Sequence, residues 1–520
     1  MAESRDHLSF FCRRIVAGLF LGLFTLALVA CSGSSSSPSS TVTTPGNPVG
    51  ANLTQVSSDP YTVAPGQHAT EVEPHMLANG NTLVAAFQTG RISPGGSTDI
   101  GWATSTDGGT TWTHGFLPGL TVGEGSGPYD AASDPNVAYD AKHLVWLISS
   151  LPISNSSATP AVAVSRSSDG MTWQNPVSVD ATAVSSDKNW IACDSGVSSP
   201  KYGNCYLEWD NPASNDEILM STSSDGGMTW GVPLPTASLA DGIGGQPLVQ
   251  PNGTVVVPIE TFGSAGDGIS AFSSSNGGLS WTAPVTVANI QVHTDAGGIR
   301  SGPLPSAAVD GAGTVWVVWE DCRFRANCLT NDLVYSTSAD GVNWGAVTRI
   351  PIDATSSTVD HFIPGIGIDP ATSGAGAHVA LHYYYYSQSS CTLATCQLYV
   401  GYISSANGGS TWSTPVALTG PMLLSWLPNS QNGLMVGDYV ATAFTSGVPH
   451  GVFAVASAIS GSTFNEATYT AQGLTVSAAG RQLSSAGDKP LHKLTDKIEN
   501  ERPEKGVIPP SRRRAKKSAK

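Results

Sequence analysis

The sequence predicts an all-β fold, assembled as one domain from a repeated antiparallel unit. Three observations predict it. A short turn motif recurs six times, short β-type runs alternate with turn residues around each copy, and the roughly 430 residues between the two ends are rich in Gly, Ser, Thr, Val and Trp but poor in charge. Length alone would permit two or three domains, but a repeat that spans most of the chain favours one.

The recurring turn begins with Ser, continues through Asp-Gly or Asn-Gly, and ends in Trp. Its six copies are Ser105–Trp112, Ser167–Trp173, Ser223–Trp230, Ser274–Trp281, Ser338–Trp344 and Ser405–Trp412, with successive Trp residues 51 to 68 positions apart. The Asp or Asn side chain accepts hydrogen bonds from the backbone that follows it, and Gly supplies a positive φ. Because the Trp ring packs beneath the turn, the motif predicts a hairpin cap and not a reaction centre.

Each copy lies within a series of four β-type runs. Around the fifth copy these are Leu304–Val309, Thr314–Trp319, Asp332–Ser338 and Gly345–Ile350. A four-stranded meander of this kind is the blade of a β-propeller, and the turn joins its third and fourth strands. The six turns resemble the Asp-box, or BNR, repeat of sialidases and related propellers, which implies the same architecture.

The number of blades can be counted in two ways. The turns number six, as in sialidases, whereas the candidate innermost strands number seven. These strands are Glu73–Ala78, Asp134–Tyr139, Lys188–Cys193, Gln246–Val249, Pro305–Val309, Phe362–Ile368 and Asp438–Ala443. Two more runs, Gly451–Ala458 and Thr463–Thr470, follow the seventh, and Leu53–Ser57 could supply its fourth strand. We therefore expect a single propeller over residues 51–475 with seven blades, six being the alternative.

The first thirty residues have the pattern of an export signal. A pair of arginines precedes an uncharged apolar run that is too short for a comfortable membrane span, so 1–30 is predicted to be a signal peptide. Leu28-Val29-Ala30-Cys31 resembles a bacterial lipobox, which implies cleavage before Cys31 and lipidation of that residue. Plain secretion is the alternative. Residues 31–50, rich in Ser, Pro and Thr, are expected to be a tether.

The other end of the chain is basic, and 476–520 is expected to be a disordered tail. From Asp488 to Lys520 there are eleven Lys or Arg against five Asp or Glu, which leaves 13 basic and 34 acidic residues elsewhere. An acidic body repels phosphates, so no nucleic-acid partner is expected. No HExxH, P-loop or dinucleotide-binding glycine pattern occurs in a suitable context, so we expect no metal and no cofactor.

Apart from Cys12 in the leader and Cys31, the cysteines form three close pairs. They are Cys193 and Cys205, Cys322 and Cys328, and Cys391 and Cys396. Zinc sites favour shorter Cys spacings with His or Cys partners nearby, and an exported chain meets an oxidising compartment. The pairs therefore predict three local disulfides in preference to metal ligands.

In a propeller blade, the loops that enter the first strand and leave the second lie on one face, and the repeated turns lie on the other. That arrangement collects many of the chain's few charges on the first face, which is the predicted site. These residues are Glu71, Glu73, Arg91, Asp134, Asp187, Lys188, Asp210, Glu260, Arg300, Glu320, Asp321, Arg323, Arg325, Asp360, His361 and Asp438-Tyr439.

The resemblance to sialidases implies a specific chemistry at that face. Three arginines would hold the substrate carboxylate, a Tyr assisted by a Glu would be the nucleophile, and an Asp would be the acid/base. The expected substrate-binding residues are Arg91, Arg300 and Arg323, the acid/base residues are expected among Glu73, Asp134, Asp187 and Asp360, and the nucleophile among Tyr384, Tyr386 and Tyr439. Sialidases typically carry Phe/Tyr-Arg-Ile-Pro in the first innermost strand, where this chain has Val72-Glu73-Pro74-His75 without Arg.

Structural roles are the alternative for several of these residues. Arg323 would only brace the loop between Cys322 and Cys328, and Glu73-Pro74 and Asp134-Pro135 would only terminate loops. Tyr383–Tyr386 alternates across a strand, so two rings would pack between blades and two would face solvent or the rim. His361, beside Asp360, is expected to make a loop hydrogen bond.

These observations lead to one functional hypothesis and a rival. The expected function is that of a sialidase-like glycoside hydrolase, or a close relative, which acts on extracellular glycans. We expect a monomer, anchored by its lipid to a membrane at the cell surface or in the periplasm. The rival is a non-catalytic propeller that binds a glycan or an envelope protein, because one fold hosts many functions.

Overall fold

The computed structural model describes residues 47–482, apart from 51, 124, 156–158, 182–184, 263–266 and 478–479. The predicted signal peptide, the lipidation site Cys31 and most of the basic tail lie outside the described residues. Within the described residues, no helix has the length and apolar character needed to cross a membrane. Helical structure there is confined to 3-10 turns at Pro212–Ser214, Ala296–Gly298, Ala326–Cys328, Gly374–Gly376 and Leu424–Trp426.

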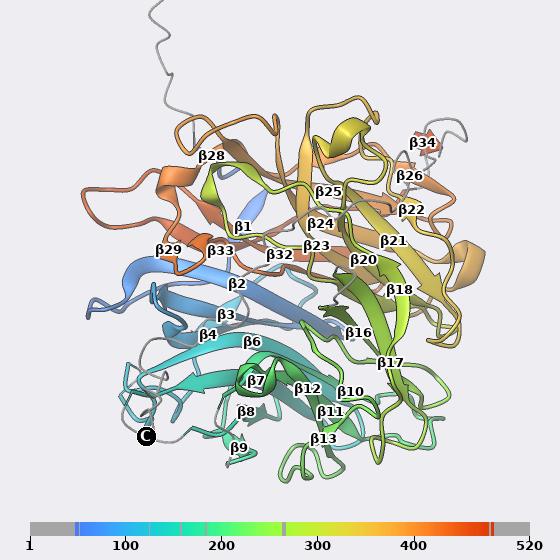
Figure 1. Cartoon of the computed structure of the whole chain (residues 1–520). Helices are drawn as coiled ribbons and strands as arrows, with labels where there is room; N and C mark the ends of the chain where they lie inside the picture. The colour runs from blue at the N-terminus through green and yellow to red at the C-terminus, as the bar shows by residue number, and fades with distance from the viewer. Residues whose placement is uncertain are drawn as a thin grey trace, which may run out of the picture. The chain divides into compact units, whose positions relative to one another are not determined.

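The chain is all-β, and its strands form successive antiparallel meanders (Figure 1). The first comprises β2 (Gln67–Asn79), β3 (Thr82–Arg91), β4 (Ser97–Ser105) and β5 (Thr113–Phe116). The second comprises β6 (Ala131–Asp140), β7 (Val145–Ile153), β8 (Val162–Ser167) and β9 (Val177–Val179). The third comprises β10 (Asp187–Cys193), β11 (Cys205–Asn211), β12 (Glu217–Ser223) and β13 (Leu234–Pro235).

The fourth meander splits its first strand into β14 (Gly242–Ile243) and β15 (Leu248–Val249) before β16 (Val255–Thr261), β17 (Gly268–Ser274) and β18 (Val285–Asn289). The fifth comprises β19 (Ser306–Val309), β20 (Val315–Asp321), β21 (Asp332–Ser338) and β22 (Thr348–Arg349). The sixth comprises β23 (Asp360–Ile368), β24 (Val379–Tyr386), β25 (Gln397–Ser405) and β27 (Val416–Ala417). Short ladders join β26 (Thr411–Ser413) to β34 (Gly480–Gln482), β28 (Met422–Leu423) to β25, and β29 (Asn429–Ser430) to β30 (Gly433–Leu434).

A seventh meander combines strands from both ends of the described chain. It comprises β31 (Ala441–Thr445), β32 (Val448–Ala456), β33 (Glu466–Ala471) and β1 (Leu53–Gln55). The register places Leu53 of β1 opposite Ala471 of β33. The run predicted at Leu53–Ser57 is thus the fourth strand of the last unit.

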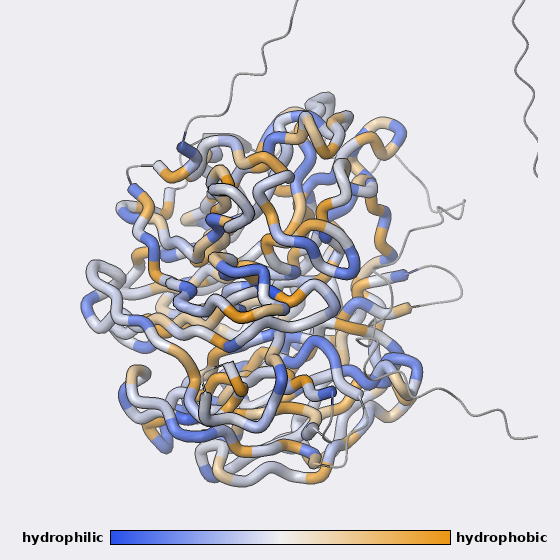
Figure 2. The backbone as a smooth tube through the Cα atoms, turned by 90° about the vertical axis from the view of Figure 1, so that its left-hand side faces the viewer, coloured by the Kyte–Doolittle hydropathy of each residue, from blue (hydrophilic) through white to orange (hydrophobic). Residues whose placement is uncertain are grey.

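Each meander packs against its neighbours through shared apolar clusters. Eight clusters lie between consecutive meanders, and one of them joins the seventh to the first through Val452 and Met76. The first strands contact one another in a cycle, from β2 through β6, β10, β15, β19, β23 and β31 back to β2. Figure 2 shows orange apolar and blue polar segments alternating along the visible backbone. Burial of apolar surface between meanders is the main force that holds the units together.

The four tyrosines of β24 show why strand residues are buried on both sides. Tyr383 belongs to the cluster shared with the fifth meander, and Tyr384 and Tyr386 belong to the cluster shared with the seventh. Tyr385 is half-buried and stacks on Tyr399, with ring centroids 5.1 Å apart. The expectation that two of these rings face solvent or the rim is therefore wrong, because a neighbouring meander covers each face of the strand.

The six repeated turns lie between third and fourth strands, as predicted. In the third, Ser223 Oγ donates to Asp225 Oδ1 at 2.8 Å and accepts from the Gly227 amide at 3.0 Å. Asp225 Oδ1 in turn accepts from the amides of Met228 and Thr229, each at 3.0 Å. Two side chains thus accept hydrogen bonds from three consecutive backbone amides of the turn.

Replacing Ser223 by Ala is expected to destabilise the protein by about 1–2 kcal/mol, because the buried Gly227 amide loses its acceptor. Chemical denaturation followed by tryptophan fluorescence measures the change. Ser224 is exposed in the same turn, and Ser224→Ala is the matched control. Equal stability of the two variants would contradict the role given to Ser223.

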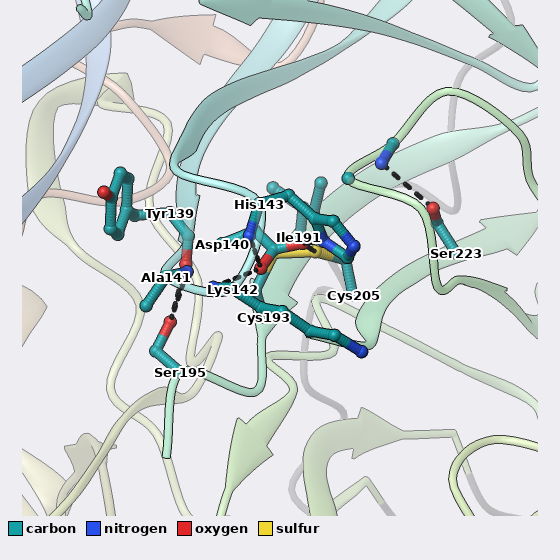
Figure 3. Close-up of a disulfide and its surroundings, with 12 residues drawn as sticks. Tyr139, Asp140, Ala141, Lys142, His143, Ile191, Cys193, Ser195, Cys205 and Ser223 are labelled. Atoms are coloured by element: carbon teal, nitrogen blue, oxygen red, sulfur yellow. Dashed lines mark hydrogen bonds and ion pairs between the residues drawn. A yellow bond between two sulfur atoms is a disulfide. The ribbon is translucent and has the colours of Figure 1, made fainter. Parts of the chain in front are cut away.

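The three predicted disulfides are confirmed. Cys193 is bonded to Cys205, Cys322 to Cys328, and Cys391 to Cys396. The first joins β10 to β11 beside the turn at Asp140–His143 (Figure 3). The bonded cysteines are 12, 6 and 5 positions apart in sequence, so each bond stabilises locally.

Candidate functional site

Three consecutive first strands bend at one charged residue each. Glu73 in β2, Asp134 in β6 and Lys188 in β10 have φ values of 54°, 49° and 44°. The ladders to the second strands shift register at the same places. Such β-bulges redirect a side chain, and positive φ at non-glycine residues costs energy that the surrounding fold must supply.

The bulges also correct the interpretation of two proline dipeptides. Glu73-Pro74 and Asp134-Pro135 lie inside β2 and β6 and do not terminate loops. A bulge accommodates Pro because the ladder is already interrupted there, so the missing amide is not needed.

The redirected side chains meet at one point. Lys188 Nζ lies 3.3 Å from Glu73 Oε1 and 3.6 Å from Asp134 Oδ2, and it also bonds Asp438 Oδ2. Arg300 holds the other side of Asp438, since its Nε donates to Oδ1 at 2.6 Å and its Nη2 donates to Oδ2. We call these five residues the mouth cluster. They come from the first, second, third and seventh meanders and from the loop before the fifth.

Charge and burial set different protonation states within the mouth cluster. Burial raises the pKa of Glu73 to about 8, although Lys188 opposes the shift. Burial would also raise the pKa of Asp134, but Lys188, the hydrogen bond from Ser133 and Arg300 together lower that pKa. Asp438 is held ionised because Arg300 and Lys188 outweigh burial and keep its pKa well below its usual range. One protonated carboxyl thus lies among ionised ones at neutral pH.

Asp187 lies beside the mouth cluster. Its side chain is more exposed than those of the other predicted acids, Glu73, Asp134 and Asp360. Its side chain is half-exposed, and its Oδ1 accepts from the Lys188 amide at 3.0 Å. Burial raises its pKa to about 6, Lys188 opposes the shift, and Asp134 adds to it. Asp187 and Asp134 therefore have pKa values displaced in opposite directions, which is the arrangement found in acid/base pairs.

Arg91 is connected to the mouth cluster through Gln88. Its Nη1 donates to Gln88 Oε1 at 3.2 Å and to the Gly96 carbonyl at 2.5 Å, and Gln88 Nε2 donates to Glu73. Burial lowers the pKa of Arg91 to about 10, so the guanidinium stays charged at neutral pH. Arg91 and Arg300 therefore act on the same carboxylates, but protein groups already engage both.

Two cavities meet at this point of the molecule. A small one, of about 20 Å³, is lined by Lys188, Asp438 and Tyr439 on one side and by Leu304 and Pro364 on the other. It has room for about one water molecule. A larger cavity of about 510 Å³ is lined by the first strands of all seven meanders. The two share the lining residues Trp190, Gln246 and Ser306.

The three predicted tyrosine nucleophiles lie in different places. Tyr439 lies beside the mouth cluster, and its hydroxyl donates to the Pro135 carbonyl at 3.0 Å. Tyr384 and Tyr386 are fully buried on β24 and donate to the carbonyls of Ala454 and Ala296. Burial raises the pKa of all three phenols, which opposes formation of a phenolate.

Replacing Tyr384 by Phe is expected to lower the free energy of unfolding by about 1–3 kcal/mol, because the hydroxyl also accepts from the Ala454 amide at 3.0 Å. Any catalytic activity per folded molecule should be unchanged. The control is Tyr399→Phe, which removes an exposed bond to Gln397. A large loss of activity with unchanged stability would instead assign Tyr384 to catalysis.

The structure does not bring Arg323 to the mouth cluster. Its Nε donates to Asp321 Oδ1 at 2.8 Å, and its Nη2 donates to Asp321 Oδ2 at 2.6 Å and to the Asn289 carbonyl. The guanidinium therefore braces the loop closed by Cys322 and Cys328. The expected group of three arginines is not assembled by the described residues.

Asp360 lies in a separate group of buried acids with Asp295 and Glu320. Burial raises the pKa of Asp360 to about 9 and that of Asp295 to about 7, and each carboxyl acts on the other. Asp360 Oδ1 accepts from the Asn331 amide at 2.6 Å. At neutral pH Asp360 is therefore protonated and Asp295 is about half ionised, and Tyr386 lies near enough for both carboxyls to raise its pKa.

His361 and its surroundings form a structural ion-pair network. His361 Nδ1 lies 3.2 Å from the Asn331 carbonyl, which agrees with the loop bond predicted for it. Asp332, Asp353 and His361 lie close enough together to resemble a metal site. Arg325 Nη2, however, bonds both carboxylates at 2.5 Å, and Arg349 bonds both at 2.9 Å. Two guanidinium groups thus occupy the place where a cation would bind.

The sequence placed Lys188 and Asp438 on the predicted rim but assigned neither a catalytic or substrate-binding role. It missed Asp295 altogether. Asp295 lies in the loop that enters the fifth meander, so the rule used for the rim would have included it if applied to every entering loop.

Comparison with known proteins gives structural neighbours at low identity. No protein-family model matches the chain. No curated protein matches it either. Similar solved structures include the leech intramolecular trans-sialidase, at 13% identity and TM-score 0.38 over 77% of this chain and 67% of that one. An ulvan lyase of family PL25 matches at 11% identity and TM-score 0.47 over 81% and 96%. The NanB sialidase from Streptococcus pneumoniae matches at 13% identity and TM-score 0.39 over 80% and 70%.

Proposed function

We propose that this chain is a glycoside hydrolase that acts on extracellular glycans, built as a seven-bladed β-propeller. The meanders would be its blades, and the cycle of contacts from β2 back to β2 supports closure of the ring. The lipobox-like segment supports anchorage of the propeller to a membrane through Cys31.

One observation carries the proposal of catalysis. Three neighbouring first strands hold Glu73, Asp134 and Lys188 at strained bulges, so that all three meet beside Asp438 and Arg300. Strain and buried charge are both costly, and together they are typical of active sites. A scaffold that needed only stability would gain by filling this point with apolar side chains.

The geometry suggests how the work is divided. Asp187, half-exposed and protonated below about pH 6, would donate a proton to the glycosidic oxygen as the bond from that oxygen to the anomeric carbon breaks. Asp134 would accept a proton from the water that attacks the anomeric carbon. Lys188 keeps Asp134 ionised, and Glu73, Asp438 and Arg300 hold Lys188 in place.

The sugar is expected to lack an essential carboxylate. Arg300 donates from two nitrogens to Asp438, and Arg91 is engaged by Gln88 and Gly96. Arg91 is also almost fully buried, so neither guanidinium presents two free nitrogens for the bidentate bond that a sialic acid carboxylate requires. We accordingly propose neutral sugars as the substrate class in place of sialosides.

A binding propeller is the second candidate, and one observation favours it. The cavity at the mouth cluster holds about one water molecule, so a glycan would have to bind above it. A surface of this kind could hold a glycan without cleaving it.

Hydrolysis of a panel of fluorogenic glycosides by the full chain in detergent tests the proposal. We expect turnover of at least one neutral glycoside and loss of that turnover in Asp134→Asn. Sialoside turnover alone would contradict the substrate class. If a correctly folded protein bound glycans on an array but cleaved none, the binding propeller would replace the enzyme.

A further inference from the structure

Between residues 53 and 477, the Lys and Arg side chains that are neither buried nor paired with an acid are gathered in one region. Nine Lys or Arg side chains lie between residues 53 and 477. Six of them are buried or paired with an acid, namely Arg91, Lys188, Arg300, Arg323, Arg325 and Arg349. The other three, Lys142, Arg166 and Lys201, all belong to the second and third meanders.

Contacts between loops place these three residues on one continuous surface. The stem of Lys142 lies against Gly203, and the stem of Lys201 lies against Gly277. Arg166 Nε donates to the Gly226 carbonyl at 2.7 Å. Figure 3 shows Lys142 and His143 beside the disulfide of Cys193 and Cys205, which fixes the loop that leads to Lys201.

Large apolar side chains project from the same loops. Leu144 is 64% exposed, Val197 81%, Met228 53% and Leu279 76%. We call these four residues, with Lys142, Arg166 and Lys201, the cationic–apolar surface. It lies at the end of the molecule that carries the repeated turns, away from the mouth cluster.

The turn does not require an apolar residue at these positions. Met228 and Leu279 follow the Gly-Gly step of their turns, and the same position holds Thr110 in the first turn and Ser410 in the sixth. Each turn closes through its Ser and its Asp or Asn, and no hydrogen bond of the turn needs the side chain of Met228 or Leu279. In the first turn, by contrast, Thr110 Oγ1 donates to the Asp107 carbonyl. Exposed apolar side chains of no structural use indicate contact with a partner.

We propose that the cationic–apolar surface docks on a membrane surface rich in anionic phospholipid. Apolar side chains on neighbouring loops can enter the membrane–water interface, while the long Lys and Arg side chains carry their charged groups to the lipid phosphates. The local positive charge is needed because the chain as a whole carries −15. Of the nearby acids, Asp140 is buried against His143, and Asp225 is half-buried and bonded by its own turn.

The test uses the full chain with Cys31→Ser, so that no lipid anchor contributes to binding. Its sedimentation with vesicles of 70% phosphatidylcholine and 30% phosphatidylglycerol is compared with that on pure phosphatidylcholine. We expect binding to the anionic vesicles alone, weakened at high salt. Lys142→Glu with Lys201→Glu should lower the partition coefficient at least 10-fold, and so should Met228→Ser with Leu279→Ser.

Val416→Ser with Val448→Ser is the matched control, because both valines are exposed but lie on the sixth and seventh meanders. Its binding should equal that of the parent. Equal binding by all variants, or no binding of the parent to either vesicle, would overturn the proposal and direct the search to a protein partner. Turnover of soluble glycosides should be the same throughout, so failure here is distinct from failure of the proposed activity.

Discussion

Asp187→Asn is expected to lower glycoside turnover by about 100-fold to 10,000-fold, the range typical for loss of a general acid. The amide keeps the shape of the side chain and can still accept from the Lys188 amide, so folding should be preserved. Measurement of kcat/KM on the best substrate from the panel, with thermal unfolding as a check of folding, gives the result. Asp187→Glu should recover part of the activity.

The pH profile adds a readout that a structural role would not change. Burial raises the pKa of Asp187 to about 6, and the acid form is the active one. Activity should therefore fall about tenfold per pH unit above pH 6. On the acid side it should fall only where Asp134 takes up a proton, below the usual range of an Asp pKa. An unchanged basic limb in Asp187→Asn would exclude Asp187 as the acid.

The second large effect is the dependence of the free energy of unfolding on pH. Burial raises the pKa of Glu71 to about 8, of Asp295 to about 7 and of Asp360 to about 9. Below about pH 4 these carboxyls are protonated in both the folded and the unfolded chain. Above it the unfolded chain loses its protons first, so the free energy of unfolding falls until each folded pKa is passed. We expect the Tm to decline steadily between about pH 5 and pH 9.

Asp360→Asn isolates one contribution to that decline. The Asn side chain keeps the acceptor for the Asn331 amide but has no proton to lose. The variant should match the parent near pH 4 and exceed its Tm by a few degrees near pH 8, because a neutral group replaces one that opposes folding. Differential scanning calorimetry across this range measures the change. Parallel curves for variant and parent would mean that Asp360 does not hold a raised pKa.

The candidate site was only partly predictable from the chain. A pattern of entering loops and second strands was enough to place Glu73, Asp134, Asp187, Lys188 and Asp438 on one rim. Which of them meet depends on bulges that reverse the φ of single residues, and no local pattern specifies those. Arg300 and Arg323 both lie in loops. Arg323 bonds Asp321 within its own loop, whereas Arg300 reaches across to Asp438.

The sequence by itself determined the unit of this protein. Ser, Asp or Asn, Gly and Trp at fixed spacing close each turn through bonds within seven residues, and the cysteines pair across short loops. Such interactions are local, so spacing along the chain is enough to predict them. Tertiary structure decided everything that depends on contacts between meanders: the burial of Tyr384, the protonation states around Lys188 and the separation of Asp360 from Asp134. Burial and charge act through space, and residues far apart in the chain supply both.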